Sequence, residues 1–440
     1  MNIILLSGGS GKRLWPLSND VRSKQFIRIF RKADGELESM VQRIYGQIKS
    51  VDPDATVTIA TSKSQVSAIH NQLGMDVGIS VEPCRRDTFA AIALATAYLH
   101  DVKKVPENEA VVVCPVDPYV EDGYFKTLEQ MCKAAEEGDK NLVLMGIEPT
   151  YPSEKYGYIK PKTTESGEQS WGFTEKPDKA KAQEYIDEGA LWNGGVFAYK
   201  LSYVLNKSKE LLGTADYETL FSTYDTLKKI SFDYAVVEAE KSIDVLKYSE
   251  TWKDLGTWNT LTEAMEEAVI GDARLNDTCE NVSVINELGV PILVMGGRDI
   301  VVSASPEGIL VSDKEQSSYI KPFVDAIDQQ IMFAEKSWGS YRVLDVEEGS
   351  MTVKVTLNPG HRMNYHSHDR RDEVWNVISG TGKAIVDGME QLVKPGDVIT
   401  MSAGCKHTVI ADDEGLQLIE VQIGEGISVS DKHKFNEKTV

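Results

Sequence analysis

A glycine-rich turn with positive charge around it follows the first apolar run of the chain. The apolar run is Ile3–Leu6, and the turn occupies the next ten positions, Ser7–Pro16. Glycine has no side chain, so the backbone N–H groups of such a turn can surround phosphate oxygens. Basic side chains lie within or soon after it, at Lys12, Arg13 and Lys24. These residue types in this order indicate the binding of a nucleoside triphosphate.

Two common phosphate-binding loops are excluded by spacing. A Walker A loop has a glycine five residues before its Gly-Lys pair and a hydroxyl residue after it, but Leu6 and Arg13 occupy those positions. A dinucleotide fingerprint that begins at Gly9 needs a small residue where Leu14 stands. The turn therefore belongs to another kind of nucleotide site.

The turn resembles the signature of sugar-1-phosphate nucleotidyltransferases, in particular mannose-1-phosphate guanylyltransferases. That signature reads Gly-Gly-Ser-Gly-Thr-Arg-Leu-Trp-Pro before a Pro-Lys-Gln-Phe, and here Lys12 replaces its threonine and Ser23 its proline. The resemblance implies that GTP and mannose 1-phosphate give GDP-mannose and pyrophosphate. It makes Arg13 and Lys24 catalytic, and its nucleotide-binding loop residues are Gly8, Gly9, Ser10, Gly11, Lys12 and Arg13.

Two aspartates have the context of the family's magnesium ligands. Asp117 follows the apolar run Ala110–Cys114, and Asp254 lies within Trp252–Trp258. Transfer of a nucleotidyl group develops negative charge on the phosphate oxygens, which a divalent metal held by carboxylates stabilises. The resemblance therefore implies that Asp117 and Asp254 are catalytic and bind Mg²⁺.

Three further segments resemble the family's sugar-binding motifs. They are Tyr156–Ile159, Trp171–Pro177 and Trp192–Phe197. In the family, the glutamate and asparagine of these motifs bind sugar hydroxyls, the lysine holds the sugar phosphate, and a glycine permits close backbone approach. The implied substrate-binding residues are Tyr156, Gly157, Glu175, Lys176 and Asn193.

The segment that would bind the nucleotide base departs from the family pattern. Glu82, Arg86 and Asp87 are the implied nucleotide-binding residues, but Asp87 stands in place of an asparagine, which both donates and accepts hydrogen bonds. Gly194 replaces a serine in the sugar motif. Two alternatives stay open: a transferase of the same chemistry for another base or hexose, and a non-catalytic sensor of sugar nucleotides.

Near the carboxyl terminus, three histidines and a glutamate have the spacing of metal ligands. Residues 360–380 match the first cupin motif at every gap, and residues 396–407 match most of the second. On adjacent strands of a small β-barrel, these side chains would point inward and suit a divalent transition metal. An empty barrel with hydrogen-bonded histidines is the alternative. The expected ligands are His366, His368, Glu373 and His407.

In two-domain members of the resembled family, this barrel can be a type II phosphomannose isomerase. Their signature places Arg-x-Glu-x-Trp directly after the histidines, whereas two residues separate Arg371–Trp375 from His368. Catalysis tolerates a misplacement of only about 1 Å between a base and the reacting carbons. The sequence therefore predicts bound metal without isomerase activity, and a bifunctional chain is the alternative.

The amino-acid composition disfavours some classes of binding partner. The 440 residues carry a formal net charge of -21, which disfavours nucleic acid and anionic membrane as partners. Residues 1–32 nevertheless hold seven basic residues and one acidic residue, as expected for a site that binds a small polyanion. Five scattered cysteines without a CxxC pair, and no signal peptide or membrane-length apolar run, predict a cytoplasmic protein. Whether the chain forms a homo-oligomer stays open.

An α/β fold is expected to position the first site. Apolar runs at 56–60, 79–81, 110–114 and 141–147 predict buried strands, and 39–49, 88–103 and 125–137 have helical spacing. This alternation predicts a mostly parallel, Rossmann-like sheet with ligands at the carboxyl ends of its strands. The predicted domains are a nucleotidyltransferase domain at 1–270, a β-rich linker region at 271–330 and a cupin β-barrel at 331–440.

Overall fold

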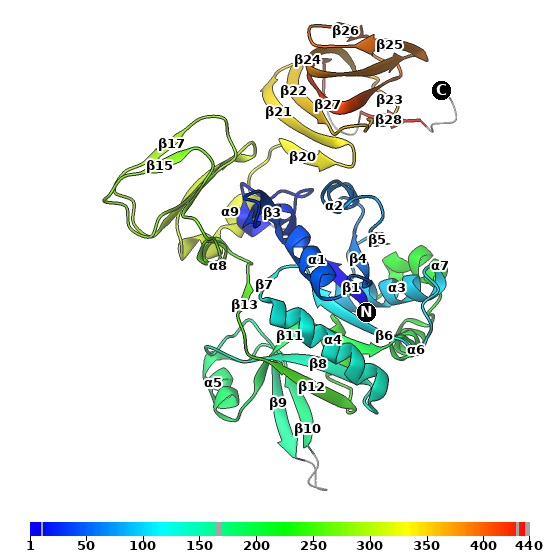
Figure 1. Cartoon of the computed structure of the whole chain (residues 1–440), viewed down its shortest axis with the longest axis vertical. Helices are drawn as coiled ribbons and strands as arrows, with labels where there is room; N and C mark the ends of the chain where they lie inside the picture. Colours follow the sequence, from blue (N-terminus) through cyan, green and yellow to red (C-terminus); the bar gives the residue numbers. More distant parts are fainter. Residues whose placement is uncertain (10–11, 164–168, 428–430, 436–440) are drawn as a thin grey trace. The chain divides into compact units, whose positions relative to one another are not determined.

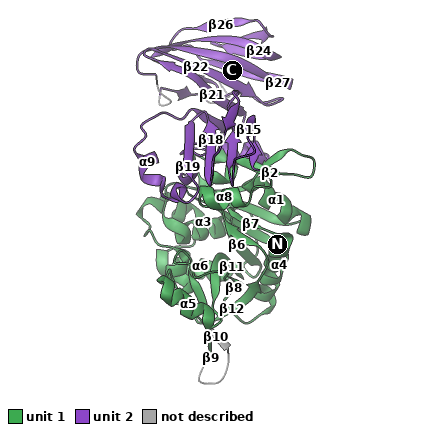
Figure 2. Cartoon of the chain, turned by 90° about the vertical axis from the view of Figure 1, so that its left-hand side faces the viewer, with its two compact units in different colours: residues 1–9, 24–66, 76–266 green, residues 10–23, 67–75, 267–440 purple. Residues whose placement is uncertain are grey.

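A computed structural model describes residues 1–9, 12–163, 169–427 and 431–435 (Figure 1). Its internal contacts divide the chain into two compact units. The first comprises residues 1–9, 24–66 and 76–266, and the second comprises residues 10–23, 67–75 and 267–440 (Figure 2). The second unit thus combines the carboxyl-terminal part of the chain with two short segments from its beginning.

The first unit is built on a nine-stranded sheet. Its strands are β1 (Asn2–Ser7), β4 (Thr56–Ser62), β5 (Gly78–Glu82), β6 (Ala110–Pro115), β8 (Leu142–Ile147), β9 (Tyr158–Thr163), β10 (Gln169–Thr174), β11 (Leu191–Lys200) and β12 (Ile243–Tyr248). Strands β5, β4, β1 and β6 are parallel neighbours, and β8 is parallel to β12. Strand β11 runs antiparallel between β6 and β8. The mostly parallel sheet that the sequence predicts is therefore present, with antiparallel strands added after β6.

Helices cover both faces of this sheet. They are α1 (Met40–Val51), α3 (Asp87–Asp101), α4 (Asp122–Glu137), α5 (Lys179–Asp187) and α6 (Leu201–Leu212). Helix α7 (Tyr217–Ser222) packs on α3, and α8 (Trp258–Glu263) also belongs to this unit. Alternate residues of a strand point to opposite faces. Ile4 and Val113 join α3 and α6 in one buried cluster, whereas Ile3, Leu5 and Val112 are equally buried and point the other way. Helices α1 and α4 pack against each other outside that cluster.

Two short ladders complete the first unit. They are β2 (Arg28–Arg31) with β3 (Leu37–Ser39), and β7 (Pro118–Val120) with β13 (Trp252–Asp254). The first ladder leads into α1, where Ser39 Oγ accepts a hydrogen bond from Gln42 N and Gln42 Oε1 accepts one from Ser39 N. This capping box satisfies backbone donors at the start of the helix. The sequence places the helix start at residue 39, within one residue of the structure.

The second unit consists mainly of β structure. Parallel and antiparallel pairs form a small four-stranded sheet, and nine strands form a curled antiparallel sheet that closes as a cupin barrel. The small sheet holds β14 (Val269–Ile270), β16 (Ser283–Asn286), β18 (Ile300–Ser305) and β19 (Gly308–Asp313), beside the pair β15 (Ala273–Leu275) and β17 (Ile292–Val294). The barrel strands are β20 (Phe333–Lys336), β21 (Gly339–Glu347), β22 (Ser350–Leu357), β23 (His366–Ser367), β24 (Arg371–Val386), β25 (Met389–Val393), β26 (Val398–Met401), β27 (His407–Gly424) and β28 (His433–Lys434).

Four helical pieces of the described residues also belong to the second unit. The 3₁₀ turn η1 (Lys12–Leu14) and most of α2 (Val66–Leu73) come from its early segments, and η5 (Gln316–Tyr319) and α9 (Lys321–Asp325) precede the barrel. No helix in the described ranges combines the length and apolar character of a membrane span.

Glu307 joins three parts of the second unit. It lies in the turn between β18 and β19, and its side chain is 6% exposed. Glu307 Oε1 accepts hydrogen bonds from Asn19 Nδ2 at 2.8 Å and from the N–H groups of Met332 and Phe333 at 3.0 and 2.9 Å. Asn19 belongs to the segment of residues 10–23, and Phe333 begins the barrel. One buried carboxylate therefore ties this segment, the small sheet and the barrel together.

Replacing Glu307 tests this junction. Glu307→Ala should lower the free energy of unfolding by about 3 kcal/mol, because each buried donor left without an acceptor costs about 1–3 kcal/mol. Denaturant unfolding of the full chain measures the change. Glu348→Ala, which removes an exposed carboxylate from the same unit, should stay within about 0.5 kcal/mol of the unmodified protein. Equal stability of the two variants would contradict the role given to Glu307.

Candidate active site

A cavity of about 470 Å³ lies at the carboxyl end of β1. Gly8 and Gly9 form part of its wall, and Gly9 has φ +115°, a conformation that glycine adopts without strain. Ser7 Oγ accepts a hydrogen bond from Gln25 Nε2 at 2.9 Å, so the residue after Lys24 supports the start of the glycine turn. Ser10 and Gly11, which the sequence also assigns to the nucleotide, lie outside the described residues.

Lys24 joins two carboxylates that come from distant parts of the chain. Its Nζ lies 2.6 Å from Asp117 Oδ2 and 3.5 Å from Asp254 Oδ1. The β7–β13 ladder sets Asp254 opposite Pro118 and hence beside Asp117. Burial disfavours the charged form of Lys24, but the two carboxylates outweigh this effect and raise the pKa of Lys24. Three residues that the sequence assigns to catalysis therefore form one charged cluster.

Of the three residues that the sequence assigns to the nucleotide base, two line the cavity and one points away from it. Glu82 and Asp87 line the cavity. Glu82 Oε2 accepts a hydrogen bond from Tyr224 Oη at 2.7 Å, and burial raises the pKa of Glu82. Arg86 donates instead to backbone carbonyls, through Nε to Tyr224 O at 3.3 Å and through Nη2 to Asp225 O. Arg86 therefore fixes the neighbouring turn.

Lys12 and Arg13 belong to the second unit. Lys12 Nζ lies 3.2 Å from Asp325 Oδ1 and 3.8 Å from Asp20 Oδ1. The hydrogen bond to Asp325 and the charge of Asp20 raise the pKa of Lys12. Arg13 is exposed. The turn thus passes from Gly8 and Gly9 in one unit to two basic residues in the other.

A second cavity of the first unit, of about 220 Å³, shares Pro115 and Asp117 with the first cavity. Four of the five residues that the sequence assigns to the sugar line it, together with Asp254: Tyr156, Gly157, Glu175 and Asn193. The fifth, Lys176, places its Nζ 2.6 Å from Glu175 Oε1. Because Asp117 lines both cavities, groups bound in the two would meet beside this carboxylate.

Four charged residues of these walls were not predicted from the sequence. Arg85 and Lys229 line the first cavity, and Lys155 and Asp233 line the second. Asp233 Oδ1 accepts a hydrogen bond from Asn193 Nδ2 at 2.6 Å, and burial raises the pKa of Asp233 to about 6. Arg85 had a signal, since it adjoins Arg86 in the same motif. Asp233 and Lys229 lie outside every motif that the sequence offered.

In the barrel, hydrogen bonds orient the three predicted histidines. The Nδ1 atoms of His366 and His407 lie 2.6 and 3.0 Å from the carbonyl oxygens of Asn364 and Cys405, and His368 Nδ1 contacts Asp431 O. A carbonyl only accepts, so each Nδ1 carries the proton and each Nε2 keeps its lone pair. This is the orientation that metal-bound histidines commonly have.

The fourth predicted ligand completes a set that fits a cation. His368 Nε2 lies 3.1 Å from Glu373 Oε1, and His407 Nε2 lies 3.2 Å from Glu373 Oε2. His407 Nε2 is buried and without a hydrogen-bond partner in the described structure. Burial lowers the pKa of His366 to about 2 and that of His368 to about 4, so both imidazoles are neutral at pH 7. Imidazole nitrogens and a carboxylate at these distances suit a divalent transition metal, which would displace the Arg371 Nη2 group that lies 2.9 Å from His368 Nε2.

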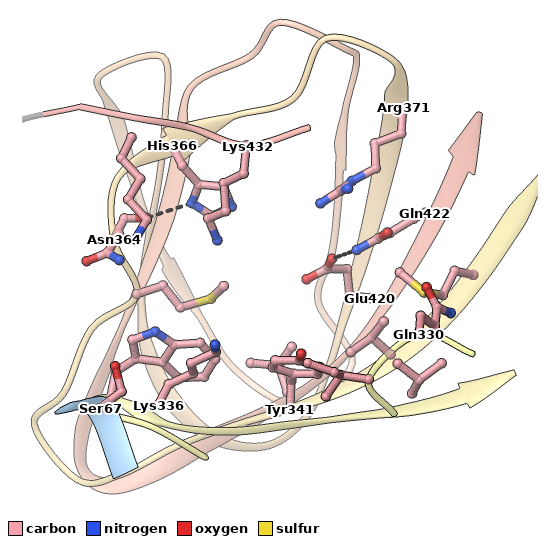
Figure 3. A pocket seen from close by; sticks show the side chains of 18 of the residues that line it. Ser67, Gln330, Lys336, Tyr341, Asn364, His366, Arg371, Glu420, Gln422 and Lys432 are labelled. Carbon is pink, nitrogen blue, oxygen red and sulfur yellow. Dashed lines mark hydrogen bonds between the residues drawn. The ribbon is translucent and has the colours of Figure 1, made fainter. Parts of the chain in front are cut away.

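The barrel cavity beside this cluster has a volume of about 350 Å³. Figure 3 shows His366 and Lys432 on one side of the cavity, with Arg371 and Glu420 on the other. Burial raises the pKa of Glu420 to about 8 and lowers that of Lys432 to about 8. Arg371 Nε donates to Glu373 Oε1 at 2.9 Å. The cavity therefore combines the histidine cluster with a buried carboxyl group, Glu420, and a buried amino group, Lys432.

Two family models match the chain. The model described as "Nucleotidyl transferase" matches residues 2–269. The chain belongs to the nucleotidyl transferase family. The model described as "Mannose-6-phosphate isomerase C-terminal" matches residues 326–437. The family that the glycine turn predicts, and the enzyme class that follows from it, are thereby confirmed.

Relatives of this nucleotidyl transferase resemble it over nearly its full length. It is 27% identical to the mannose-1-phosphate guanylyltransferase of Escherichia coli K12, with 99% of this chain and 98% of that one covered. It is 29% identical to the xanthan biosynthesis protein XanB of Xanthomonas campestris, with 99% and 98% covered. A crystal structure from Thermus thermophilus, titled as a mannose-1-phosphate geranyltransferase, matches with a TM-score of 0.62 and 28% identity over 74% of this chain and 98% of that chain.

The histidine cluster predicts a bound metal. Protein grown with transition metals should carry about one transition-metal ion per chain, and the His366→Ala, His368→Ala double variant should lose it, because two of four ligands are gone. Elemental analysis of the purified protein measures the content. His361→Ala, which removes an exposed imidazole of the same barrel, is the control and should keep the metal. A metal-free wild type, or a double variant that retains its metal, would contradict the assignment.

Proposed function

We propose that the chain transfers a guanylyl group from GTP to mannose 1-phosphate, which gives GDP-mannose and pyrophosphate. The observation that carries this proposal is the cluster of Lys24, Asp117 and Asp254 where a nucleotide-sized and a hexose-sized cavity meet. A phosphate oxygen of the sugar would attack the α-phosphorus of GTP there. One P–O bond forms, and the bond to the departing pyrophosphate breaks.

The chain's own residues would position and neutralise the reacting phosphates. The N–H groups at Gly8 and Gly9 would hold the triphosphate, and the Lys24 ammonium would balance charge that develops on it. Arg13 and Lys12, on the same turn, would add charge at the pyrophosphate. Asp117 and Asp254 suit Mg²⁺, which supplies charge neutralisation at the phosphates when bound. Catalysis would therefore rest on position and charge.

The second cavity would hold the mannose. Glu175 and Asn193 would bind its hydroxyls, Lys176 its phosphate, and Tyr156 and Gly157 would shape the wall. Guanine would bind on the side of Glu82 and Asp87. Base and hexose rest on the names of the relatives, because Asp87 and Gly194 depart from the family's motifs. Another base or hexose is therefore the alternative within the same chemistry.

Loss of either aspartate tests the proposed site. Asp117→Asn and Asp254→Asn should each lower the release of pyrophosphate from GTP, mannose 1-phosphate and Mg²⁺ by at least about 1000-fold, because each removes an anionic metal ligand worth several kcal/mol. Asp139→Asn, which changes an exposed loop carboxylate, is the control. Near-normal rates in either active-site variant would refute the metal site. A wild type that binds both substrates without turnover would favour the sensor.

The barrel has a second candidate function. The stretched motif predicts metal without isomerase activity, but Glu420 and Lys432 line the same cavity as His366, and a carboxyl and an amino group beside the histidines favour a metal-dependent sugar-phosphate isomerase. An assay of the interconversion of mannose 6-phosphate and fructose 6-phosphate decides whether the barrel only binds metal or is an isomerase. Activity that disappears in Lys432→Ala would make the chain bifunctional. Metal-loaded protein without isomerisation would support the prediction from the sequence.

A further inference from the structure

Asp233 is a carboxylate of the sugar-side cavity to which no motif assigns a role. It begins a π-helical turn, Asp233–Val237, in which Glu238 N–H donates to Asp233 O at 2.9 Å. Such turns insert one residue into a helix and occur often at functional sites. The preceding residue is anchored, because Phe232 is buried and its N–H donates to Thr88 Oγ1 at 2.9 Å. The backbone therefore holds Asp233 at the cavity wall.

Asp233 also fixes the amide of Asn193. Asn193 Nδ2 donates to Asp233 Oδ1 at 2.6 Å, while Asn193 Oδ1 accepts from Gly195 N at 3.1 Å. The amide can therefore have only one orientation, because a carboxylate accepts and an N–H donates. An amide has two hydrogens and two lone pairs on its oxygen, so each side of Asn193 keeps capacity for one further bond. Since Asn193 lines the cavity, a bound hydroxyl would meet a defined donor and acceptor.

Two carboxylates besides Asp117 and Asp254 line the sugar-side cavity. They are Asp233 and Glu175, whose charges interact, in a cavity of about 220 Å³. Trp252 and Tyr156 line the same cavity, with ring centroids 5.3 Å apart. Two carboxylates beside aromatic rings suit an uncharged molecule with several O–H donors and apolar C–H faces. One hexose ring has this chemistry and this size.

We propose that Asp233 is a sugar-specificity residue, whose carboxylate accepts a hydrogen bond from a hexose hydroxyl and whose contact with Asn193 orients the amide toward a second one. This inference rests on the proposed transfer to a hexose 1-phosphate. It predicts discrimination between epimers, because reversing one hydroxyl leaves an enclosed carboxylate without its donor. A lost hydrogen bond to a charged group changes specificity by about 10- to 100-fold.

The test measures pyrophosphate release with mannose 1-phosphate and glucose 1-phosphate. Asp233→Asn should raise the KM for mannose 1-phosphate about 10- to 100-fold and reduce the preference between the two sugars by a similar factor. The KM for GTP should stay within about twofold, since Asp233 lies on the sugar-side cavity. Asp244→Asn, an exposed carboxylate of the same unit, should leave all three quantities unchanged.

A merely structural role would give a different result. It would raise both KM values together and lower the melting temperature, without changing the preference between sugars. Should Asp233→Asn fail to fold, Asn193→Ala should show the same loss of preference, because it removes the oriented amide. If the Asp233→Asn variant is active with unchanged sugar kinetics, the role given to Asp233 is wrong but the proposed function stands. A wild type inactive with every sugar 1-phosphate and every nucleoside triphosphate would overturn the proposed function instead.

Discussion

Two carboxylates held beside one partly buried ammonium are the constraint on which the candidate site of the first unit depends. Asp117 and Asp254 would repel each other without a cation, and Lys24 Nζ supplies one at 2.6 Å from Asp117 Oδ2 and 3.5 Å from Asp254 Oδ1. The sheet brings Asp117 to the end of β6, and the short β7–β13 ladder returns the chain so that Asp254 lies beside it. Both cavities open at this point because Asp117 belongs to both walls. The surrounding fold therefore serves to place charge where a phosphate would react.

The barrel also holds a cluster of candidate metal ligands, built from histidines and a glutamate. Three imidazoles lie side by side in a buried site because backbone carbonyls fix their protons on Nδ1. The Nε2 atoms of His368 and His407 then lie 3.1 and 3.2 Å from the Glu373 carboxylate, an arrangement that a cation would stabilise. In both units, side chains that could bind a metal lie beside a basic residue. In the first unit Lys24 lies between two aspartates, whereas in the barrel Arg371 donates a hydrogen bond to Glu373.

Much of this arrangement follows from local sequence. Apolar runs separated by amphipathic segments give the parallel strands, and the glycine turn falls at the end of β1, as expected. The spacing of His366, His368, Glu373 and His407 predicts a cluster because neighbouring strands of a barrel fix which side chains point inward. The three histidines do form one, and Glu373 lies beside two of them. Contacts between residues far apart in the chain could not be predicted from local sequence. Residues 12–23 are joined to the small β-sheet by contacts that include Glu307 with Asn19 and Ser305 with Pro16, and the place of Asp233 depends on a π-helical turn. Neither feature leaves a periodic signal in the sequence.

The proposed reaction joins GTP to mannose 1-phosphate where the two cavities of the first unit meet. The most direct measurement offers the full chain all four nucleoside triphosphates together with mannose 1-phosphate and glucose 1-phosphate in the presence of Mg²⁺, and identifies the sugar nucleotide by mass spectrometry and chromatography. The account predicts GDP-mannose as the dominant product, formed in equal amount with pyrophosphate. A different base or hexose in the dominant product would contradict the assigned substrates, and the absence of any sugar nucleotide would contradict the assigned reaction.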